Sequence, residues 1–189
     1  MKTNKLLSVV LTLCVLLAAF SLTALAAEGV TTAKDLATAL AAGGEVRLDA
    51  DITSVGAPVT VPAGVTASLD LNGHTLTVSK YTAKKDQVLV AGSLTLTDSV
   101  GTGKVCSDFT GTSGRVVSVS GSGSLQLAGG TITTEGMEKS GSAVYVAANC
   151  KFTMSGGTVY ADAKRNNSAV NLANAKASME MRGGTITAI

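Results

Sequence analysis

One phrase recurs along most of this 189-residue chain: an apolar-x-apolar triplet, a turn that usually contains glycine, and an apolar residue flanked by threonine. The apolar residue near the end of each copy returns after 29, 27, 27 and 27 residues. A fixed period of this length is typical of a solenoid, in which each repeat forms one coil. The copies are LDLNGHTLT at 69–77, LTLTDSVGTGKVC at 94–106, LQLAGGTIT at 125–133, FTMSGGTVY at 152–160 and MEMRGGTIT at 179–187, and the returning residues are Leu76, Val105, Ile132, Val159 and Ile186.

A second apolar triplet precedes each copy, so every coil has three apolar segments. Side chains alternate along a strand, so Val144 and Val146 can point inward while Tyr145 points outward. Phe152 and Met154 then enter from the next segment. One coil cannot bury these residues alone, whereas coils stacked ~4.8 Å apart enclose a continuous apolar column. The three segments define a first, a second and a third wall.

The pattern predicts an all-β fold, a right-handed parallel β-helix of about 5–6 coils over residues 45–189. The Gly-Gly pairs at 129–130, 156–157 and 183–184 fit corners that need a positive φ. An antiparallel sandwich would not require like residues at a 27-residue period. A left-handed helix would require a more regular hexapeptide pattern.

The N-terminal segment has the pattern of a secretory signal peptide. A positively charged start is followed by an apolar run over residues 6–20, which is shorter than the ~20 residues of a spanning helix. Small residues end the segment and predict cleavage before Ala27, so that 1–26 is removed and the protein is secreted or held at the cell surface. An uncleaved membrane anchor is the alternative; after cleavage we expect no membrane contact.

Residues 27–44 are expected to cap the solenoid. An amphipathic helix is predicted over 32–42, with its apolar face at positions 36, 39 and 40. Such a helix would cover the open end of the apolar column, and a strand over 45–52 would follow.

Composition and charge exclude several function classes. The chain is 46% hydrophobic but only 3% aromatic, which favours many short strands over an aromatic-rich globular core. Loss of Lys2 and Lys5 with the signal peptide leaves 15 − 2 = 13 basic residues against 13 acidic ones, which argues against nucleic acid as a partner. We expect Cys106 and Cys150 to be unpaired, and no metal or other cofactor is indicated.

The residues DLATALAAGGEVRLDADI, VTVPAGVTASLDLNGHTL and the GGTIT-type coils that follow resemble the pectin-lyase-like superfold of right-handed parallel β-helices. More narrowly, they are similar to secreted and surface-attached proteins of Gram-positive bacteria. The resemblance covers about Ala33 to Ile189. It implies polysaccharide cleavage or binding in many members and adhesin or stalk roles in others, and a fold alone does not choose between them.

A catalytic site is not indicated by the walls. Glycosidases typically need two carboxylates within about 5–10 Å. On the second wall the outward carboxylates, Asp70 and Glu180, are four coils apart, ~19 Å by strand spacing. His74 is expected to be a solvated turn residue. We therefore predict no catalytic residues and no enzyme activity for this segment.

The outward threonines of the third wall raise ice binding as a remote alternative. The Thr-x-Thr ladder is interrupted by Lys104 and Cys106, and Tyr160 replaces a threonine. Threonine is also simply a good outward strand residue.

The long corner between the third wall and the next first wall is the better binding candidate. Coil stacking places its four loops, 79–86, 107–114, 134–141 and 161–168, on one edge, and insertions in repeats commonly form the binding face. Two aromatic residues in neighbouring coils could stack on a sugar ring. Plain solvated loops are the alternative. The candidate ligand-binding residues are Tyr81, Lys84, Lys85, Phe109, Lys139, Lys164 and Arg165.

These patterns predict a structural or adhesive module whose long-loop edge binds a polysaccharide, either a host or a cell-wall glycan. A fragment of a polysaccharide lyase or glycoside hydrolase is the alternative. The sequence stops at Ile189, directly after a third-wall strand and without a polar cap. We read this as either truncation of a longer protein with further coils or the presence of a covering partner.

Overall fold

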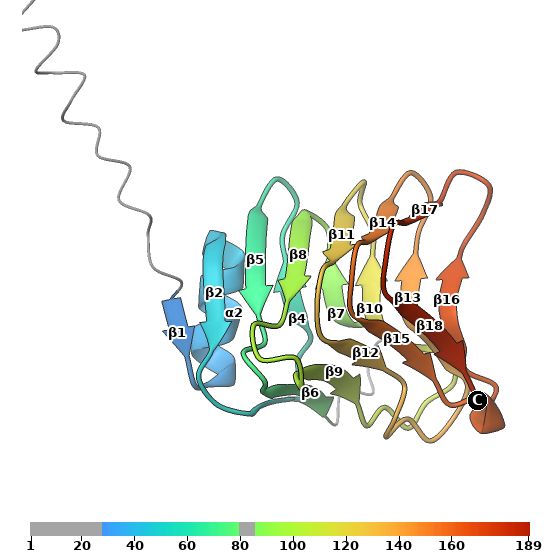
Figure 1. Cartoon of the computed structure of the whole chain (residues 1–189), viewed down its shortest axis with the longest axis horizontal. Helices are drawn as coiled ribbons and strands as arrows, with labels where there is room; N and C mark the ends of the chain where they lie inside the picture. The colour runs from blue at the N-terminus through green and yellow to red at the C-terminus, as the bar shows by residue number, and fades with distance from the viewer. Residues whose placement is uncertain (1–27, 80–85) are drawn as a thin grey trace, which may run out of the picture.

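The computed structural model describes residues 28–79 and 86–189 and confirms a mostly β fold, a parallel β-solenoid of about five turns (Figure 1). Each turn supplies one strand to each of three sheets, and neighbouring strands in every sheet are parallel. The first wall contains β4 (Val59–Val61), β7 (Asp86–Val90), β10 (Gly114–Val119), β13 (Gly141–Val146) and β16 (Ser168–Leu172). The second contains β1 (Glu28–Val30), β2 (Gly44–Leu48), β5 (Thr66–Asp70), β8 (Ser93–Thr97), β11 (Ser124–Leu127), β14 (Lys151–Met154) and β17 (Ser178–Met181). The third contains β3 (Ile52–Val55), β6 (Thr75–Ser79), β9 (Lys104–Ser107), β12 (Thr131–Thr133), β15 (Thr158–Ala161) and β18 (Thr185–Ala188).

The register follows the sequence repeat. On the third wall Ile132 pairs with Val159, and Val159 pairs with Ile186. On the second wall Leu125 pairs with Phe152, which pairs with Met179. Equivalent apolar residues of successive repeats therefore lie above one another, as the 27-residue period predicts.

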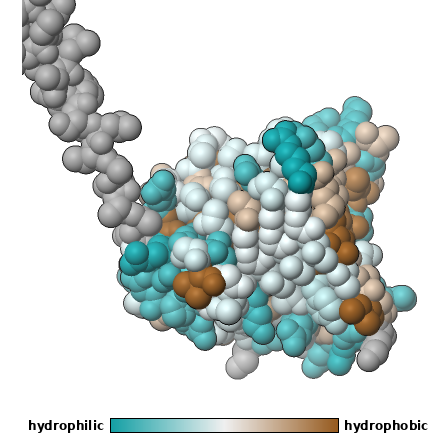
Figure 2. Space-filling view, in the orientation of Figure 1, coloured by the Kyte–Doolittle hydropathy of each residue, from teal (hydrophilic) through white to brown (hydrophobic). Residues whose placement is uncertain are grey.

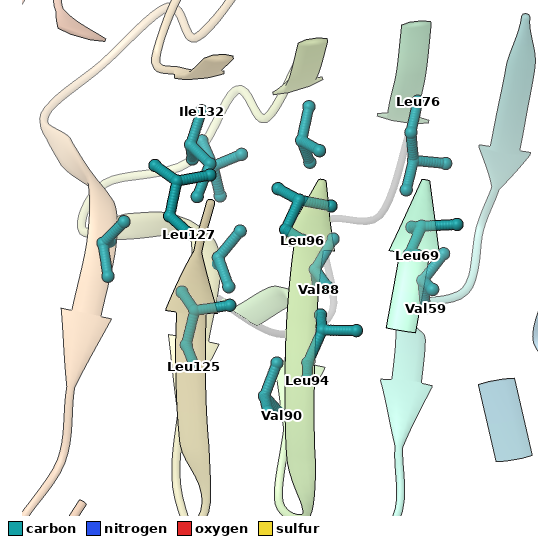
Figure 3. Close-up of a cluster of buried hydrophobic side chains, with 14 of the residues drawn as sticks. Val59, Leu69, Leu76, Val88, Val90, Leu94, Leu96, Leu125, Leu127 and Ile132 are labelled. Carbon is teal, nitrogen blue, oxygen red and sulfur yellow. The ribbon is translucent and has the colours of Figure 1, made fainter. Parts of the chain in front are cut away.

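The apolar core fills the inside of this tube. Leu69, Leu96 and Leu127 of the second wall point toward Val59 and Val88 of the first (Figure 3). All five side chains are at most 3% exposed. Burial of this column in every turn is what makes the stack of coils stable, because a single coil would leave both its sides in water.

The N-terminal part adds a strand to the expected helix. β1 precedes the helix α2 (Ala33–Ala42) and pairs in parallel with β2. Thr32 caps α2, because its Oγ1 accepts a hydrogen bond from the Asp35 N–H at 3.1 Å. α2 contacts β1 to β5, strands of all three walls, and buries Leu36, Ala39 and Leu40 against them. The helix thus covers one end of the apolar column.

The single strand expected over 45–52 is instead two strands on different walls. β2 ends at Leu48 and β3 begins at Ile52. The intervening corner is held because the Asp49 N–H donates to the Val30 carbonyl at 2.9 Å and Asp51 Oδ1 accepts from the Thr75 N–H at 2.8 Å. These two hydrogen bonds stabilise the turn between β2 and β3.

Candidate functional site

The long corners lie on one edge of the solenoid, as the repeat predicts. The strands that follow them pair in register: Gly114 with Gly141, and Ser142 with Ser168. Buried polar side chains line the inside of this edge. Ser107 Oγ donates to the Val78 carbonyl at 3.0 Å and lies 3.3 Å from Gln87 Oε1, and both side chains are at most 1% exposed. These bonds fix the path of the loops against the core.

The structure describes only part of the predicted binding set of the long corner. Tyr81, Lys84 and Lys85 lie outside the described residues. Lys139 is exposed on its loop, and Lys164 belongs to the short 3-10 helix Ala163–Arg165.

Phe109 departs from the prediction that its ring stacks on a sugar. The residue is only 4% exposed. Its ring occupies the space beside Gly111 and Gly114, where an added β-carbon would come within 2.5 and 2.4 Å of ring carbons. Because the ring fills the corner from the inside, it has no free face for a ligand in this structure.

Arg165 does lie at a hollow surface, a groove of about 540 Å³ that we call the third-wall groove. It runs across successive turns, from the start of β9 to the loop after β15. Its chemistry comes from six of its lining residues: Lys104, Thr131, Glu135, Tyr160, Asp162 and Arg165.

Two ion pairs line this groove, one between neighbouring turns and one within a single loop. Lys104 Nζ lies 3.5 Å from Glu135 Oε2, and Arg165 Nε lies 3.7 Å from Asp162 Oδ2. Arg165 Nη1 also donates to the Glu138 carbonyl at 2.9 Å, which ties two neighbouring loops together. The two cations and two carboxylates balance, so these four side chains give the groove both donors and acceptors without net charge.

Buried threonines hold the acidic side of the groove in place. Thr133 Oγ1 accepts from the Glu135 N–H at 3.0 Å, and Thr134 Oγ1 accepts from the Asp162 N–H at 2.9 Å. Thr133 and Thr134 are at most 2% exposed. The second bond joins consecutive turns, so Asp162 is positioned by the turn before it.

Tyr160 is the aromatic residue of the groove. It is partly exposed and occupies an outward position of the third wall, paired with Thr133 on one side and Thr187 on the other. The sequence showed this tyrosine only as an interruption of the threonine ladder. Two signals in the sequence could have identified this groove. Tyr160 is an outward aromatic residue directly before a long loop, and Glu135 and Asp162 each follow one of the paired positions 133 and 160 by two residues.

A second, more polar groove of about 360 Å³ lies on the first wall beside the same edge. Here the Arg115 guanidinium carbon lies 3.4 Å from the centroid of the Tyr145 ring, and Arg115 Nη1 bonds Asp86 Oδ1 at 3.1 Å. The stacked arginine covers one face of Tyr145. Most of the other lining residues are serines and asparagines, among them Ser142, Asn166, Ser168 and Asn171.

The remaining sequence candidates have structural partners. His74 Nδ1 lies 3.3 Å from Asp51 Oδ1 at a corner. The Thr75 N–H that bonds Asp51 lowers the pKa of that carboxyl. On the second wall β5 and β17, which carry Asp70 and Glu180, have three strands between them. Hydrogen bonds from Arg182 and Lys151 lower the pKa of Glu180 to about 2.

Cys106 and Cys150 are both free, as expected. Within residues 28–79 and 86–189, no group of three or more His, Cys, Asp or Glu side chains is placed to hold a metal ion. No helix in the same ranges is long and apolar enough to cross a membrane.

Comparisons were made with family models, with curated proteins and with solved structures, and none of them matches this chain.

Proposed function

We propose that this chain is a secreted or cell-surface solenoid, coiled to the right as in the pectin-lyase-like superfold, that binds glycans in its third-wall groove. The observation that carries the proposal is the position of Tyr160 in a groove that is also lined by two ion pairs. Aromatic faces stack on the apolar faces of sugar rings, while carboxylates and guanidinium groups bond the hydroxyls around them.

The charge of the groove indicates the kind of glycan. Lys104 and Arg165 each lie beside a carboxylate. A polyanionic ligand would have to displace these carboxylates or leave them facing its own charge. We therefore expect uncharged polysaccharides to bind better than polyuronates.

The parallel walls also suit an elongated ligand. The groove is lined by residues of successive turns, and strand spacing repeats equivalent positions every ~4.8 Å. A glycan chain lying along the solenoid axis would contact Lys104, Thr131 and Tyr160 in turn. This arrangement supports an adhesive role, in which the long edge of the molecule lies against a polymer.

The alternative, a fragment of a polysaccharide-active enzyme, has one observation in its favour. Glu135 and Asp162 follow the paired residues Thr133 and Tyr160 by two positions each, so neighbouring turns present two carboxylates to one groove. Retaining glycosidases use carboxylates about 5–5.5 Å apart. Release of reducing ends from a bound polysaccharide would favour this alternative over simple binding.

The test is binding of the purified chain to an array of plant, bacterial and host-type glycans, with Tyr160→Ala as the variant and Tyr145→Ala as its control. Loss of the ring from the groove should weaken binding about tenfold, about 1.4 kcal/mol, which is within the range of aromatic contacts. Tyr145→Ala removes a partly exposed tyrosine from the other groove and should leave this binding unchanged. An array without any bound glycan, or equal losses in the two variants, would refute the proposal.

A further inference from the structure

The groove on the first wall, which we call the first-wall groove, is separate from the third-wall groove although two loops contribute to both. Loop 134–141 supplies Glu135 to the third-wall groove and Ser140 to the first-wall groove. Loop 161–168 supplies Arg165 to the third-wall groove and Asn166 to the first-wall groove. In Figure 2 hydrophilic residues gather along the lower edge, where Figure 1 shows the loops that follow β12 and β15. The long corner therefore lies between two polar surfaces that can be tested one at a time.

The lining of the first-wall groove repeats from turn to turn. Strand pairing places Arg115, Ser142 and Ser168 in one row. Tyr145 and Asn171 pair in a second row. Neighbouring positions within a row are about 4.8 Å apart. A guanidinium group and several hydroxyl and amide groups therefore border one hollow of about 360 Å³.

The charge of this groove differs from that of the third-wall groove. Of the described residues that line it, Arg115 is the only charged one. Its ion-pair partner Asp86 lies on the preceding turn and is not among the described lining residues. The third-wall groove, by contrast, is lined by the carboxylates of Glu135 and Asp162 as well as by two cations. An anion in the first-wall groove therefore meets a cation and no carboxylate among the described lining residues.

The guanidinium group of Arg115 is held in place before any ligand binds. Arg115 Nη1 donates to Asp86 Oδ1 at 3.1 Å, and the guanidinium carbon lies 3.4 Å from the centroid of the Tyr145 ring. The group thus lies between a carboxylate of the turn before and a ring of the turn after. A guanidinium carries five N–H donors, more than a single carboxylate oxygen uses. A side chain that is already fixed loses little conformational freedom on binding.

We infer that the first-wall groove binds a tetrahedral oxyanion, the sulfate or phosphate group of a monoester. The anion contacts the Arg115 guanidinium through charge-assisted hydrogen bonds. The hydroxyls of Ser140 and Ser168 and the amide of Asn171, which all reach the surface, donate to its other oxygens. Donors from three turns suit oxygens that point in four directions, whereas a planar carboxylate would use the guanidinium fork alone. This inference does not rest on glycan binding, because it concerns the other groove and an ionic ligand.

The first test is a titration of the isotope-labelled full chain with sodium sulfate and with sodium phosphate at constant ionic strength, followed by NMR. We expect saturable shifts of the Gly114 and Asn171 amide signals, and none with sodium chloride. Arg115→Gln should weaken anion binding about tenfold or more, because it removes the charged donor. Arg47→Gln is the matched control, since Arg47 is an exposed, ion-paired arginine on the second wall.

A variant of nearly unchanged shape separates charge from packing. Asn171→Asp places a carboxylate in the lining and should weaken the binding of both anions about tenfold. Asn174→Asp introduces the same charge at an exposed position outside the described lining, and it should leave binding unchanged. Circular dichroism checks that each variant is folded.

Glucose 6-sulfate and glucose 6-phosphate then distinguish the two kinds of ester, with glucose as the uncharged reference. Saturable shifts of the same amides with either ester, but not with glucose, would support the inference and identify the ester that the groove prefers. Shifts that do not saturate with any of the four anions, or binding of the inorganic anions and of neither ester, would overturn it. Equal effects within either pair of variants, Arg115→Gln with Arg47→Gln or Asn171→Asp with Asn174→Asp, would overturn it as well.

Discussion

Single carboxylates hold the corner between the second and third walls. Asp70 Oδ1 accepts from the Asn72 N–H and from the Ser99 N–H, both at 2.9 Å. Asp98 accepts from the Gly73 N–H at 2.8 Å and from the Gly103 N–H at 2.6 Å. Each carboxylate therefore joins its own turn to a neighbouring one, which gives the acidic residues of this corner a structural role.

These bonds predict an acid-sensitive stability. Burial opposes ionisation of Asp70, but the N–H groups of Ser99 and Asn72 outweigh it, so the pKa of the Asp70 carboxyl lies below its ordinary value of 3.8. The folded chain therefore holds this proton less tightly than the unfolded chain. The stabilisation is complete above pH 3.8 and is lost as the pH falls through the lower folded pKa.

Asp70→Asn should remove this dependence while keeping an oxygen acceptor. We expect the variant to lose up to about 1 kcal/mol at pH 7, because partial exposure screens the charge, and to match the wild type near pH 2. Urea unfolding at a series of pH values measures the difference. Glu45→Gln, on the exposed face of β2, is the control; a constant difference between Asp70→Asn and wild type at all pH values would contradict the assignment.

For single residues, the sequence predicted which way a side chain points from its strand better than it predicted what surrounds that side chain. The inward and outward alternation of Val144 and Tyr145 followed from strand geometry, and the structure confirms it. Phe109 was misjudged because a loop residue was assumed to face water, whereas the long corner has an interior of its own that the ring fills. Tyr160 was undervalued because only contact between turns shows that it borders a groove.

Corners are the elements that decide whether the coils can stack closely. In each Gly-Gly pair the second glycine has a positive φ, 76° at Gly130, 72° at Gly157 and 88° at Gly184. A β-carbon on Gly157 would also lie 2.6 Å from the Gly130 carbonyl oxygen of the preceding turn. Glycine is required here both by the backbone angle and by the distance between turns.

Two substitutions separate these requirements. Gly64 has a φ of 78° but open space around its β-carbon position, so Gly64→Ala should cost only the backbone strain, roughly 1–2 kcal/mol. Gly157→Ala should cost clearly more, because the turns must also move apart. Equal losses in the free energy of unfolding by urea titration would show that spacing between turns does not constrain this corner.

Element boundaries were predictable where a local signal exists. The amphipathic face and the glycines that follow it predicted a helix over 32–42, and α2 spans Ala33–Ala42 after a Thr32 cap. The separation of β2 from β3 was missed, because the bonds that turn the chain come from Val30 and Thr75, both distant in sequence.

The whole molecule follows from one closed turn repeated along an axis. Parallel stacking gives the walls, and the long corners give the edge with a groove on either side. The period in the sequence was sufficient to predict this arrangement. The grooves were not predictable, because they depend on how far long side chains of one turn reach over the next.

Methyl–methyl NOEs in the folded chain test this stacking most directly. The structure predicts cross-peaks between Ile132 and Val159 and between Val159 and Ile186, which pair in adjacent strands. It predicts none between Ile132 and Ile186, two turns apart at about 9.6 Å. Absence of the first two cross-peaks, or a direct contact between Ile132 and Ile186, would contradict the one-turn repeat on which the fold and the third-wall groove depend.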